Sequence, residues 1–502
     1  MIGEIASWLS SPRDAAALSL TGKLFNKEME RRIYNSISLP IIDLDDTHWA
    51  LLLRTFASRP DLAARVQKLE LEIHYCTYTS CPGRCLPSYM PATGFSSIED
   101  DTLVIKYPPG DSTRVSSQEL QSLYAGKFCP AAQVLTLANL TPKLKHLSVA
   151  IDDSNQRLQS IFFMRSMREP TAECWQRLFR SVRPSLSYLE SLSITGIGGL
   201  DGGIGVRYKH DFNDLSFFWN MPSLKTLRAD GCDPYCRLEM DKFKPQTSSI
   251  TKLVLHQTSV NLLQLSTLIL SCQTLRSFTL CLNTWVMRQP LHRWREIIQV
   301  LEPAKDALEY LSLGWSLEDI DGDDTVEMCL LRVLPIKSLK HFSSLAHVRL
   351  PFRALFVEEH DEDDEEGPPY SVYPAPLEDI LPPSLSILEL NVEDSERRTT
   401  YEVASESFER LRQCAHDKLP KLTKVAAVGR NACTSEPTDR EKDLVTFFKE
   451  IGVELDWNSG YGVDWHRFGH DFKIGNSEGI LLPDYISSPI LISDSDSEEY
   501  NW

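Results

Sequence analysis

A six-residue pattern of apolar and polar positions recurs along this chain. It reads apolar-x-x-apolar-x-apolar, and residues 144–149 (LKHLSV) and 308–313 (LEYLSL) are typical examples. The last three positions alternate apolar, polar and apolar, which predicts a short strand with one buried face. Ten copies begin at the following residues: Val66, Leu144, Leu189, Leu224, Ile250, Leu275, Leu308, Leu345, Leu385 and Leu422.

Segments with helical periodicity lie between several of these predicted strands. They are residues 261–271, 292–301, 401–415 and 439–452. Prolines just upstream of many copies can end the preceding element: Pro142, Pro184, Pro222, Pro383 and Pro420. From Leu144 onward, successive copies are 25 to 45 residues apart. Because one such unit cannot bury its apolar face alone, we expect the units to stack into a continuous core.

The array between about residues 60 and 457 resembles an irregular leucine-rich-repeat solenoid, which implies an α/β fold. The copies vary in spacing and lack the asparagine or cysteine that usually follows the strand, so the resemblance predicts no particular curvature. The alternative is an ordinary α/β domain with parallel strands. A doubly wound sheet usually has longer apolar strands, and the repeat is therefore the favoured interpretation.

The first 39 residues predict two or three short helices. Ile2, Ile5 and Leu9 follow helical spacing, and Ser11 and Pro12 can cap and start the next helix. Helices this short bury too little surface to be stable alone. The segment therefore needs a partner or a neighbouring domain.

This N-terminal segment resembles an F-box. The residues that match the family pattern are Glu4, Ile5, Trp8, Leu9, Pro12, Asp14, Leu18, Leu20, Lys23, Leu24, Phe25 and Asn26. The Leu-Pro pair that usually opens the motif is missing, and Gly22 stands where a cysteine is frequent. The resemblance implies binding to the Skp-family adaptor of a cullin-RING ubiquitin ligase through Ile5, Trp8, Leu9, Pro12, Leu18, Leu20 and Phe25. The alternative is a helical cap on the N-terminal end of the solenoid.

The formal net charge of −18 is unevenly distributed. Residues 358–366 hold eight acidic side chains, and four more occur between residues 494 and 499. An acidic chain argues against broad nucleic-acid binding, which requires a basic face. The sequence shows no apolar stretch long enough to span a membrane and no secretory signal, and its twelve cysteines are too sparse for a disulfide scaffold. These features predict an intracellular protein, cytoplasmic or nuclear.

Two acidic segments are candidate binding motifs. Ile490, Leu491 and Ile492 precede Asp494 and further serine and acidic residues, and this tail resembles a SUMO-interacting motif. The serines stand in an acidic context suited to phosphorylation. The alternative is a solubilising tail. The run at 358–366, followed by Gly-Pro-Pro, predicts a solvated disordered loop or, alternatively, a docking site for a basic partner.

No enzyme, metal or cofactor motif is predicted. His74, Cys76, Cys81 and Cys85 are possible zinc ligands by type, but their spacing is not that of paired ligands, and an ordinary loop is favoured. The glycine-rich residues 196–205 lack the pattern of a phosphate-binding loop. Neither a Gly-x-Ser-x-Gly elbow nor a His-Glu-x-x-His helix occurs.

The sequence thus predicts four regions. Residues 1–40 form the shortened F-box-like segment, and 41–143 hold a linker, the first repeat strand and an irregular insertion with cysteines. Residues 144–457 form the solenoid with an acidic loop at 358–369, and 458–502 form a largely disordered tail. The predicted function is substrate recognition for a cullin-RING ubiquitin ligase, with an unknown protein substrate. The alternative is a ligase-independent interaction scaffold.

Overall fold

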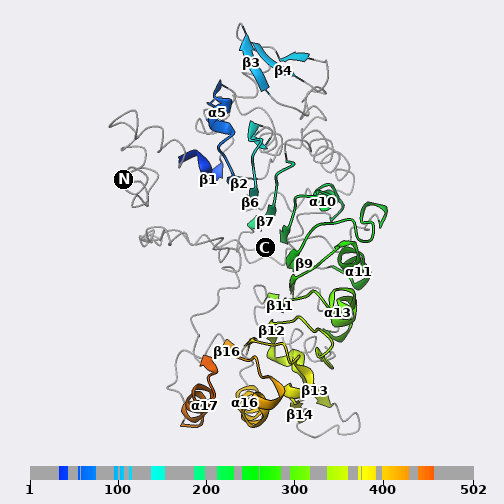
Figure 1. Cartoon of the computed structure of the whole chain (residues 1–502), viewed down its shortest axis with the longest axis vertical. Helices are drawn as coiled ribbons and strands as arrows, with labels where there is room; N and C mark the ends of the chain where they lie inside the picture. The colour runs from blue at the N-terminus through cyan, green and yellow to red at the C-terminus, as the bar shows by residue number, and fades with distance from the viewer. Residues whose placement is uncertain are drawn as a thin grey trace, which may run out of the picture.

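The molecule is an arc of strands with helices along its outer side (Figure 1). The computed structural model describes residues 33–42, 52, 55–56, 58–74, 95–99, 102–106, 112–115, 137–138, 140–152, 186–197, 212–230, 240–258, 260–283, 294–316, 336–359, 371–374, 376–391, 398–428 and 439–456. Helices α10 (Phe212–Trp219), α11 (Leu262–Ser271) and α13 (Trp294–Val300) follow one another along the outer side. Among the described residues, no helix is long and apolar enough to cross a membrane.

Twelve strands form one all-parallel sheet in which each strand pairs with its neighbours in chain order. The strands are β1 (Ser36–Ile42), β2 (Lys68–His74), β6 (His146–Asp152), β7 (Ser191–Ile197), β8 (Thr226–Asp230), β9 (Lys252–Thr258), β10 (Ser277–Asn283), β11 (Tyr310–Ser316), β12 (His347–Pro351), β15 (Ile387–Asn391), β16 (Lys424–Val428) and β17 (Glu454–Asp456). A doubly wound sheet reverses its strand order, and this sheet does not. The architecture is that of a repeat solenoid and is compatible with leucine-rich repeats.

All ten predicted copies contain a strand of this sheet, from β2 to β16. The sheet also has a strand at each end, β1 and β17, that was not among the ten predicted copies, although residues 34–39 (YNSISL) carry the same pattern. Strand β1 begins at Ser36, so five residues of the segment predicted to be all-helical, 36–40, are extended. They pair in parallel with β2, which provides the backbone hydrogen bonds that a lone strand lacks.

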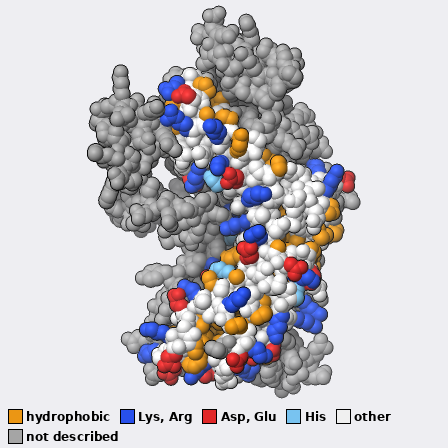
Figure 2. Space-filling view, viewed as in Figure 1, with side chains coloured by type: hydrophobic (Ala, Val, Ile, Leu, Met, Phe, Trp, Pro, Cys, Tyr) orange, Lys and Arg blue, Asp and Glu red, His pale blue; other side chains and the backbone are white. Residues whose placement is uncertain are grey.

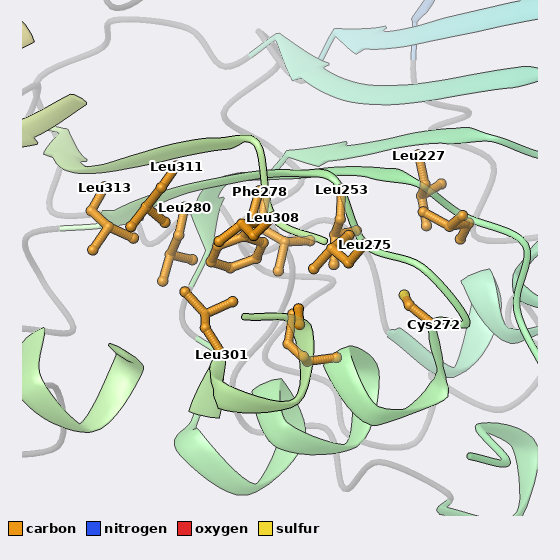
Figure 3. Close-up of a cluster of buried hydrophobic side chains, with 14 of the residues drawn as sticks. Leu227, Leu253, Cys272, Leu275, Phe278, Leu280, Leu301, Leu308, Leu311 and Leu313 are labelled. Atoms are coloured by element: carbon orange, nitrogen blue, oxygen red, sulfur yellow. The ribbon is translucent and has the colours of Figure 1, made fainter. Parts of the chain in front are cut away.

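The register of the strands stacks the apolar positions of successive copies. The residues that pair across the sheet include Leu69, Leu147, Leu192, Leu227, Leu253, Phe278, Leu311, Val348, Leu388 and Val425, and all of them are buried. The first apolar residue of every copy is buried as well. Figure 3 shows Leu253, Phe278 and Leu311 projecting from their strands toward the helices. Burying each such side chain stabilises the fold by about 1.5–3 kcal/mol before entropic costs.

The four helices predicted from periodicity are confirmed. They are α11, α13, α16 (Arg398–Lys418) and α17 (Asp439–Glu450). A capping box starts α11: the Asn261 side chain accepts from the Gln264 N–H at 2.9 Å, and the Gln264 side chain accepts from the Asn261 N–H at 3.0 Å. The two contacts satisfy backbone donors that the first turn of a helix leaves unpaired.

In the twelve-stranded sheet, each strand from β6 to β12, and also β15 and β16, begins with the same hydrogen-bond unit. One carbonyl of the preceding repeat accepts from two consecutive N–H groups, as Gln67 does from Lys145 at 2.8 Å and from His146 at 2.9 Å. A tight turn precedes the strand, and Leu144 closes it by donating to the Thr141 carbonyl at 3.1 Å. The unit holds successive strands in one register along the sheet.

Two small antiparallel sheets and several short helices complete the described structure. Strands β3 (Phe95–Glu99), β4 (Thr102–Lys106) and β5 (Ser112–Val115) form one sheet, and β13 (Phe356–Glu359) and β14 (Ser371–Pro374) form the other. The acidic run therefore begins within β13, because Glu358 and Glu359 pair with β14 instead of lying in a loop. The short helices are α5 (Pro60–Ala63), α15 (Leu377–Ile380), η3 (Met240–Lys242), η4 (Glu302–Ala304) and η5 (Phe352–Leu355).

A candidate partner-binding face

The sheet surface opposite the helices carries two continuous rows of mostly polar residues. Successive side chains of a strand point to opposite faces, so the residues that flank the buried apolar positions face away from the core. The register aligns one row as Lys68, His146, Ser191, Thr226, Lys252, Ser277, Tyr310, His347, Ile387 and Lys424. The other row is Glu70, Ser148, Ser193, Arg228, Val254, Thr279, Ser312, Arg349, Glu389 and Ala426. We call this surface the inner face.

A buried ion pair lies on the inner face of β8. Arg228 and Asp230 are two residues apart on the strand and therefore point to the same side. The Arg228 Nη2 lies 2.8 Å from the Asp230 Oδ2, and the Nε lies 3.2 Å from both carboxylate oxygens. Only 5% of Arg228 and 6% of Asp230 is exposed. The paired geometry fixes the guanidinium plane, so its position on the face is well defined.

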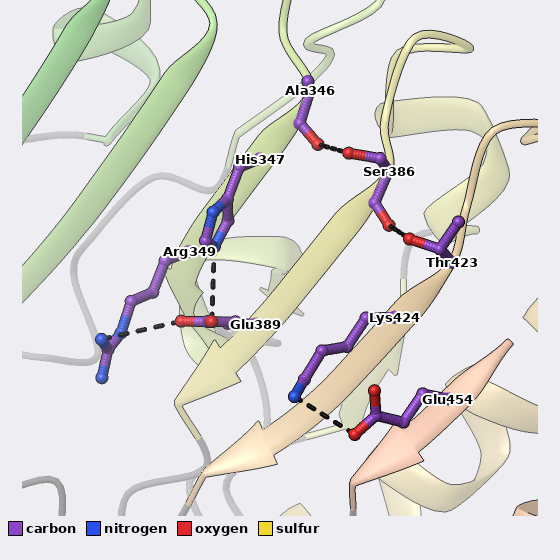
Figure 4. A network of polar contacts seen from close by, with 8 residues as sticks. All are labelled: Ala346, His347, Arg349, Ser386, Glu389, Thr423, Lys424 and Glu454. Atoms are coloured by element: carbon purple, nitrogen blue, oxygen red, sulfur yellow. Dashed lines mark hydrogen bonds and ion pairs between the residues drawn. The ribbon is translucent and has the colours of Figure 1, made fainter. Parts of the chain in front are cut away.

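A second polar cluster spans β11, β12 and β15 (Figure 4). The Glu389 carboxylate lies between two cationic or potentially cationic groups, 3.3 Å from the His347 Nε2 and 3.6 Å from the Arg349 Nη1. The Tyr310 ring meets the His347 ring edge-on, with the ring centroids 4.7 Å apart. These contacts join three neighbouring repeats through side chains as well as through the backbone ladder.

Electrostatics within this cluster favour the ionised carboxylate. Burial alone would raise the pKa of Glu389, but the contacts with His347 and Arg349 outweigh it, so the pKa is lowered. Burial raises the pKa of Tyr310, although its hydrogen bonds with Ser312 and Thr279 act in the opposite direction. At neutral pH the cluster therefore holds a charged Glu389 beside a neutral phenol.

Two basic side chains of the inner face have lowered pKa values. Burial lowers the pKa of Lys252, and the nearby charge of Arg228 lowers it further. Burial also lowers the pKa of His146, where Lys68 and Lys145 act in the same direction and Glu190 opposes them. In Figure 2, Lys, Arg and His side chains reach the surface in the middle of the arc.

Side-chain hydrogen bonds connect adjacent repeats at the edge where the strands begin. The Ser386 Oγ donates to the Ala346 carbonyl at 2.8 Å, and the Thr423 Oγ1 donates to the Ser386 carbonyl at 3.0 Å (Figure 4). Further along, the Lys424 Nζ lies 3.3 Å from the Glu454 Oε1. These contacts hold the C-terminal repeats together and so fix the relative positions of the inner-face side chains.

Two of the described thiols, Cys272 and Cys414, are held in their protonated form. Burial raises the pKa of Cys272 to about 12 and that of Cys414 to about 11. A thiol is a poor nucleophile and metal ligand in that form. Among the described residues, no group of three or more His, Cys, Asp or Glu side chains is arranged to hold a metal ion. The polar groups described on the inner face form hydrogen bonds and ion pairs.

Most residues singled out from the sequence lie outside the described residues. These are the F-box-like residues Ile5, Trp8, Leu9, Pro12, Leu18, Leu20 and Phe25, the tail residues Ile490, Leu491, Ile492 and Asp494, and the cysteines Cys76, Cys81 and Cys85. His74 is the last residue of β2, and Gly196 lies in β7, so the glycine-rich stretch begins within a strand. The adaptor and SUMO assignments therefore stay predictions.

Reasoning from the sequence predicts that a substrate binds the strand face or a loop between repeats, but it named no residue of the inner face. Its charged residues occupy the x positions of the repeat pattern, as Arg228 does in 224–229 and Glu389 does in 385–390. Aligning the copies would have placed these positions in rows. The pairing of particular side chains across the rows depends on their rotamers, which the repeat spacing does not reveal.

Comparison of the sequence with protein-family models finds no match, and comparison with curated proteins finds none either. The functional argument therefore rests on the chain itself.

Proposed function

We propose that this chain is the substrate-recognition adaptor of a cullin-RING ubiquitin ligase. In this proposal, residues 1–40 bind a Skp-family adaptor and the inner face of the solenoid binds the protein substrate. The observation that supports it most is the continuous polar inner face of a twelve-stranded parallel sheet, directly after an F-box-like sequence. The face spans about 50 Å at the usual strand spacing, which is long enough for a protein partner.

The mechanism would be proximity. A substrate held on the inner face would share one assembly with the ubiquitin-loaded ligase, and its effective concentration at the reactive centre would rise. Binding and orientation are the only tasks that this assigns to the solenoid. Hydrogen bonds and ion pairs on a rigid, repeat-stacked sheet are suited to that task.

The test is co-purification of residues 1–502 with a Skp-family adaptor. We expect the wild-type chain to bind and the W8A/L9A double variant to lose binding, because the F-box resemblance assigns both side chains to the adaptor contact. The matched control is Y188A/L263A, which removes one aromatic and one leucine side chain that are 60% and 67% exposed on the solenoid. The control variant should bind as the wild type does. Failure of the wild type to bind would contradict the proposal.

The second candidate function is a ligase-independent scaffold whose N-terminal helices only cap the solenoid. One observation favours it: Tyr34, Ile37 and Leu52 pack against the core beside β1, where the stack of repeats begins. Tyr34 also contacts Phe56, with ring centroids 6.1 Å apart. A terminal repeat needs such a cover. The scaffold predicts that W8A/L9A lowers the melting temperature while the wild type binds no adaptor.

A further inference from the structure

Lys252 lies on the inner face of β9 beside a fixed positive charge. In the register of β8 and β9, Lys252 is level with Thr226, and Arg228 is the next residue of β8 on the same face. At about 3.3 Å per residue, Arg228 lies about 7 Å further along the strand and Asp230 about 13 Å further. The Arg228 end of the buried ion pair is therefore the end nearer to Lys252 along the sheet.

The residues level with Lys252 on both neighbouring strands carry hydroxyl groups. They are Thr226 on β8 and Ser277 on β10. Among the inner-face positions described on β8, β9 and β10, Asp230 is the only acidic residue, and it is paired with Arg228 at 2.8 Å. Lys252 therefore stands among hydroxyl groups with a cation close by, which is an environment that favours the neutral amine.

Two further titratable side chains occupy inner-face positions of these strands. His256 lies four residues beyond Lys252 on β9, and Cys281 lies four residues beyond Ser277 on β10. Four residues correspond to about 13 Å along a strand, so neither residue is an immediate neighbour of the lysine. Arg228 is the charged inner-face residue closest to Lys252 in the register.

Burial acts on Lys252 in the same direction as Arg228. Both lower the pKa of the amine, and burial is the larger cause. The Lys252 side chain is nevertheless partly exposed, whereas Arg228 and Asp230 are buried. Lysine amines that are partly desolvated and lie beside a second cation are the ones that act as nucleophiles toward carbonyl compounds. Lys252 combines these properties with access for a small reagent.

We propose that Lys252 is a nucleophilic lysine that forms an imine with a small aldehyde at the inner face. The neutral Nζ attacks the carbonyl carbon and forms a C–N bond. The nitrogen then loses its protons, the former carbonyl oxygen leaves as water, and a C=N double bond remains. One aldehyde is consumed and one water is released, so the step requires no oxidant or reductant. A small aldehyde is specified because the side chain is only partly exposed.

The experiment treats the full chain with acetaldehyde and cyanoborohydride. The hydride reduces each imine to an N-ethyl amine, and digestion followed by mass spectrometry gives the ethylation rate of individual lysines between pH 6.5 and 10. The reference is Lys244, an exposed lysine two residues after η3 and outside the inner face. We expect the ratio of the Lys252 rate to the Lys244 rate to be severalfold higher at pH 7 than at pH 10, because the lowered pKa of Lys252 leaves more of its amine neutral at the lower pH.

Two variants of Thr226 test the electrostatic environment. Thr226→Glu places a carboxylate level with Lys252 and should lower the rate ratio at pH 7 severalfold, since a nearby anion favours the ammonium form. Thr226→Gln is the matched control, because it adds a neutral side chain of the same size and should leave the ratio within about twofold of the wild type. The R228M/D230L variant removes the neighbouring cation and should lower the ratio as well. Circular dichroism checks that each variant is folded.

Equal pH dependence of ethylation at Lys252 and Lys244 would overturn the inference, and so would equal effects of Thr226→Glu and Thr226→Gln. An absence of ethylation at Lys252 would overturn it directly. The inference does not rest on the proposed function, so the W8A/L9A variant should react as the wild type does. Adaptor binding without reaction at Lys252 would contradict only this inference, and reaction without adaptor binding would contradict only the proposed function.

Discussion

Arg228 and Asp230 are charged residues that the fold removes almost completely from water. Their mutual contacts compensate for the lost hydration only while both are present. Asp230→Asn should therefore destabilise the chain by about 3 kcal/mol, because a buried guanidinium would lose its countercharge. Urea unfolding followed by circular dichroism measures the effect.

The double variant R228M/D230L is the control for this pair. It replaces the two charges with apolar side chains of similar length, and buried ion pairs replaced in this way often cost little stability. We expect the double variant to be more stable than Asp230→Asn. Equal or greater destabilisation in the double variant would show that packing around β8, and not the unpaired charge, accounts for the loss.

Glu389 makes stability depend on acidic pH. Its pKa is lowered from the ordinary value of 4.5, since the contacts with His347 and Arg349 outweigh the opposing effect of burial. A carboxyl group with a depressed pKa contributes stability above its unfolded-state pKa and loses it as the pH falls through the folded-state pKa. The melting temperature of wild type should exceed that of Glu389→Gln between pH 5 and 7, and the gap should close below pH about 4.5. A gap that stayed constant down to pH 3 would contradict this assignment.

At the scale of single residues, the sequence predicted which residues are buried better than it predicted which side chains contact one another. The apolar positions of the repeat identified Leu227, Phe278 and Leu311 as core residues, and all three are buried. The same pattern showed Arg349 and Glu389 only as polar positions. Their ion pair joins different strands, so it depends on register and side-chain rotamers together. This ion pair is for this reason a structural finding, whereas the buried rows follow from the sequence.

Among the elements, helices with clear periodicity were predicted closely, and the end strands were not. Residues 261–271 predicted a helix, and α11 runs from Leu262 to Ser271 with Asn261 as its cap. Strand β17 has three residues, and Gly452 stands where the pattern has its first apolar position. Residues 34–39 (YNSISL) do carry the repeat pattern, in register with the copy that begins at Val66. Strand β1 could therefore have been predicted from the sequence, whereas β17 depends on the hydrogen bonds that β16 supplies.

The end of α17 depends on a glycine. Gly452 has a φ of +77°, its N–H donates to the Lys449 carbonyl at 3.1 Å, and the Val453 N–H donates to the Phe448 carbonyl at 2.8 Å. This pair of contacts is the Schellman arrangement, which requires a left-handed residue at this position. Gly452→Ala should lower the free energy of unfolding by about 1 kcal/mol.

Gly452→Asn is the graded control for the helix end, since asparagine tolerates the left-handed conformation better than alanine. Its unfolding free energy should fall between those of the wild type and Gly452→Ala. No atom lies within 4 Å of the Cβ that alanine would add, so a steric clash does not explain the loss. An alanine variant as stable as the wild type would mean that the backbone rearranges at this helix end.

At the scale of the whole molecule, each repeat stacks mainly on its two neighbours in the sequence. Among the described residues, the strands of the large sheet follow one another in chain order from β1 to β17, and no strand pairs with a distant repeat. Stability in such an array is approximately a sum of repeat terms and nearest-neighbour terms. A destabilising substitution in one repeat should consequently destabilise the adjacent repeats as well, and the effect should decrease with distance along the array.

Leu280→Asp tests this coupling in the middle of the arc. Leu280 is buried between β10 and the helices, and a carboxylate there would be desolvated without a partner (Figure 3). We expect hydrogen–deuterium exchange to accelerate most in β9, β10 and β11 and least in β2 and β16. Thr279→Asp is the matched control, because it adds the same charge one residue away on the inner face and should leave exchange in the leucine rows unchanged. Uniform acceleration across all twelve strands would show instead that the sheet opens as one cooperative unit. Stability would then depend on the entire array and not on contacts between neighbouring repeats.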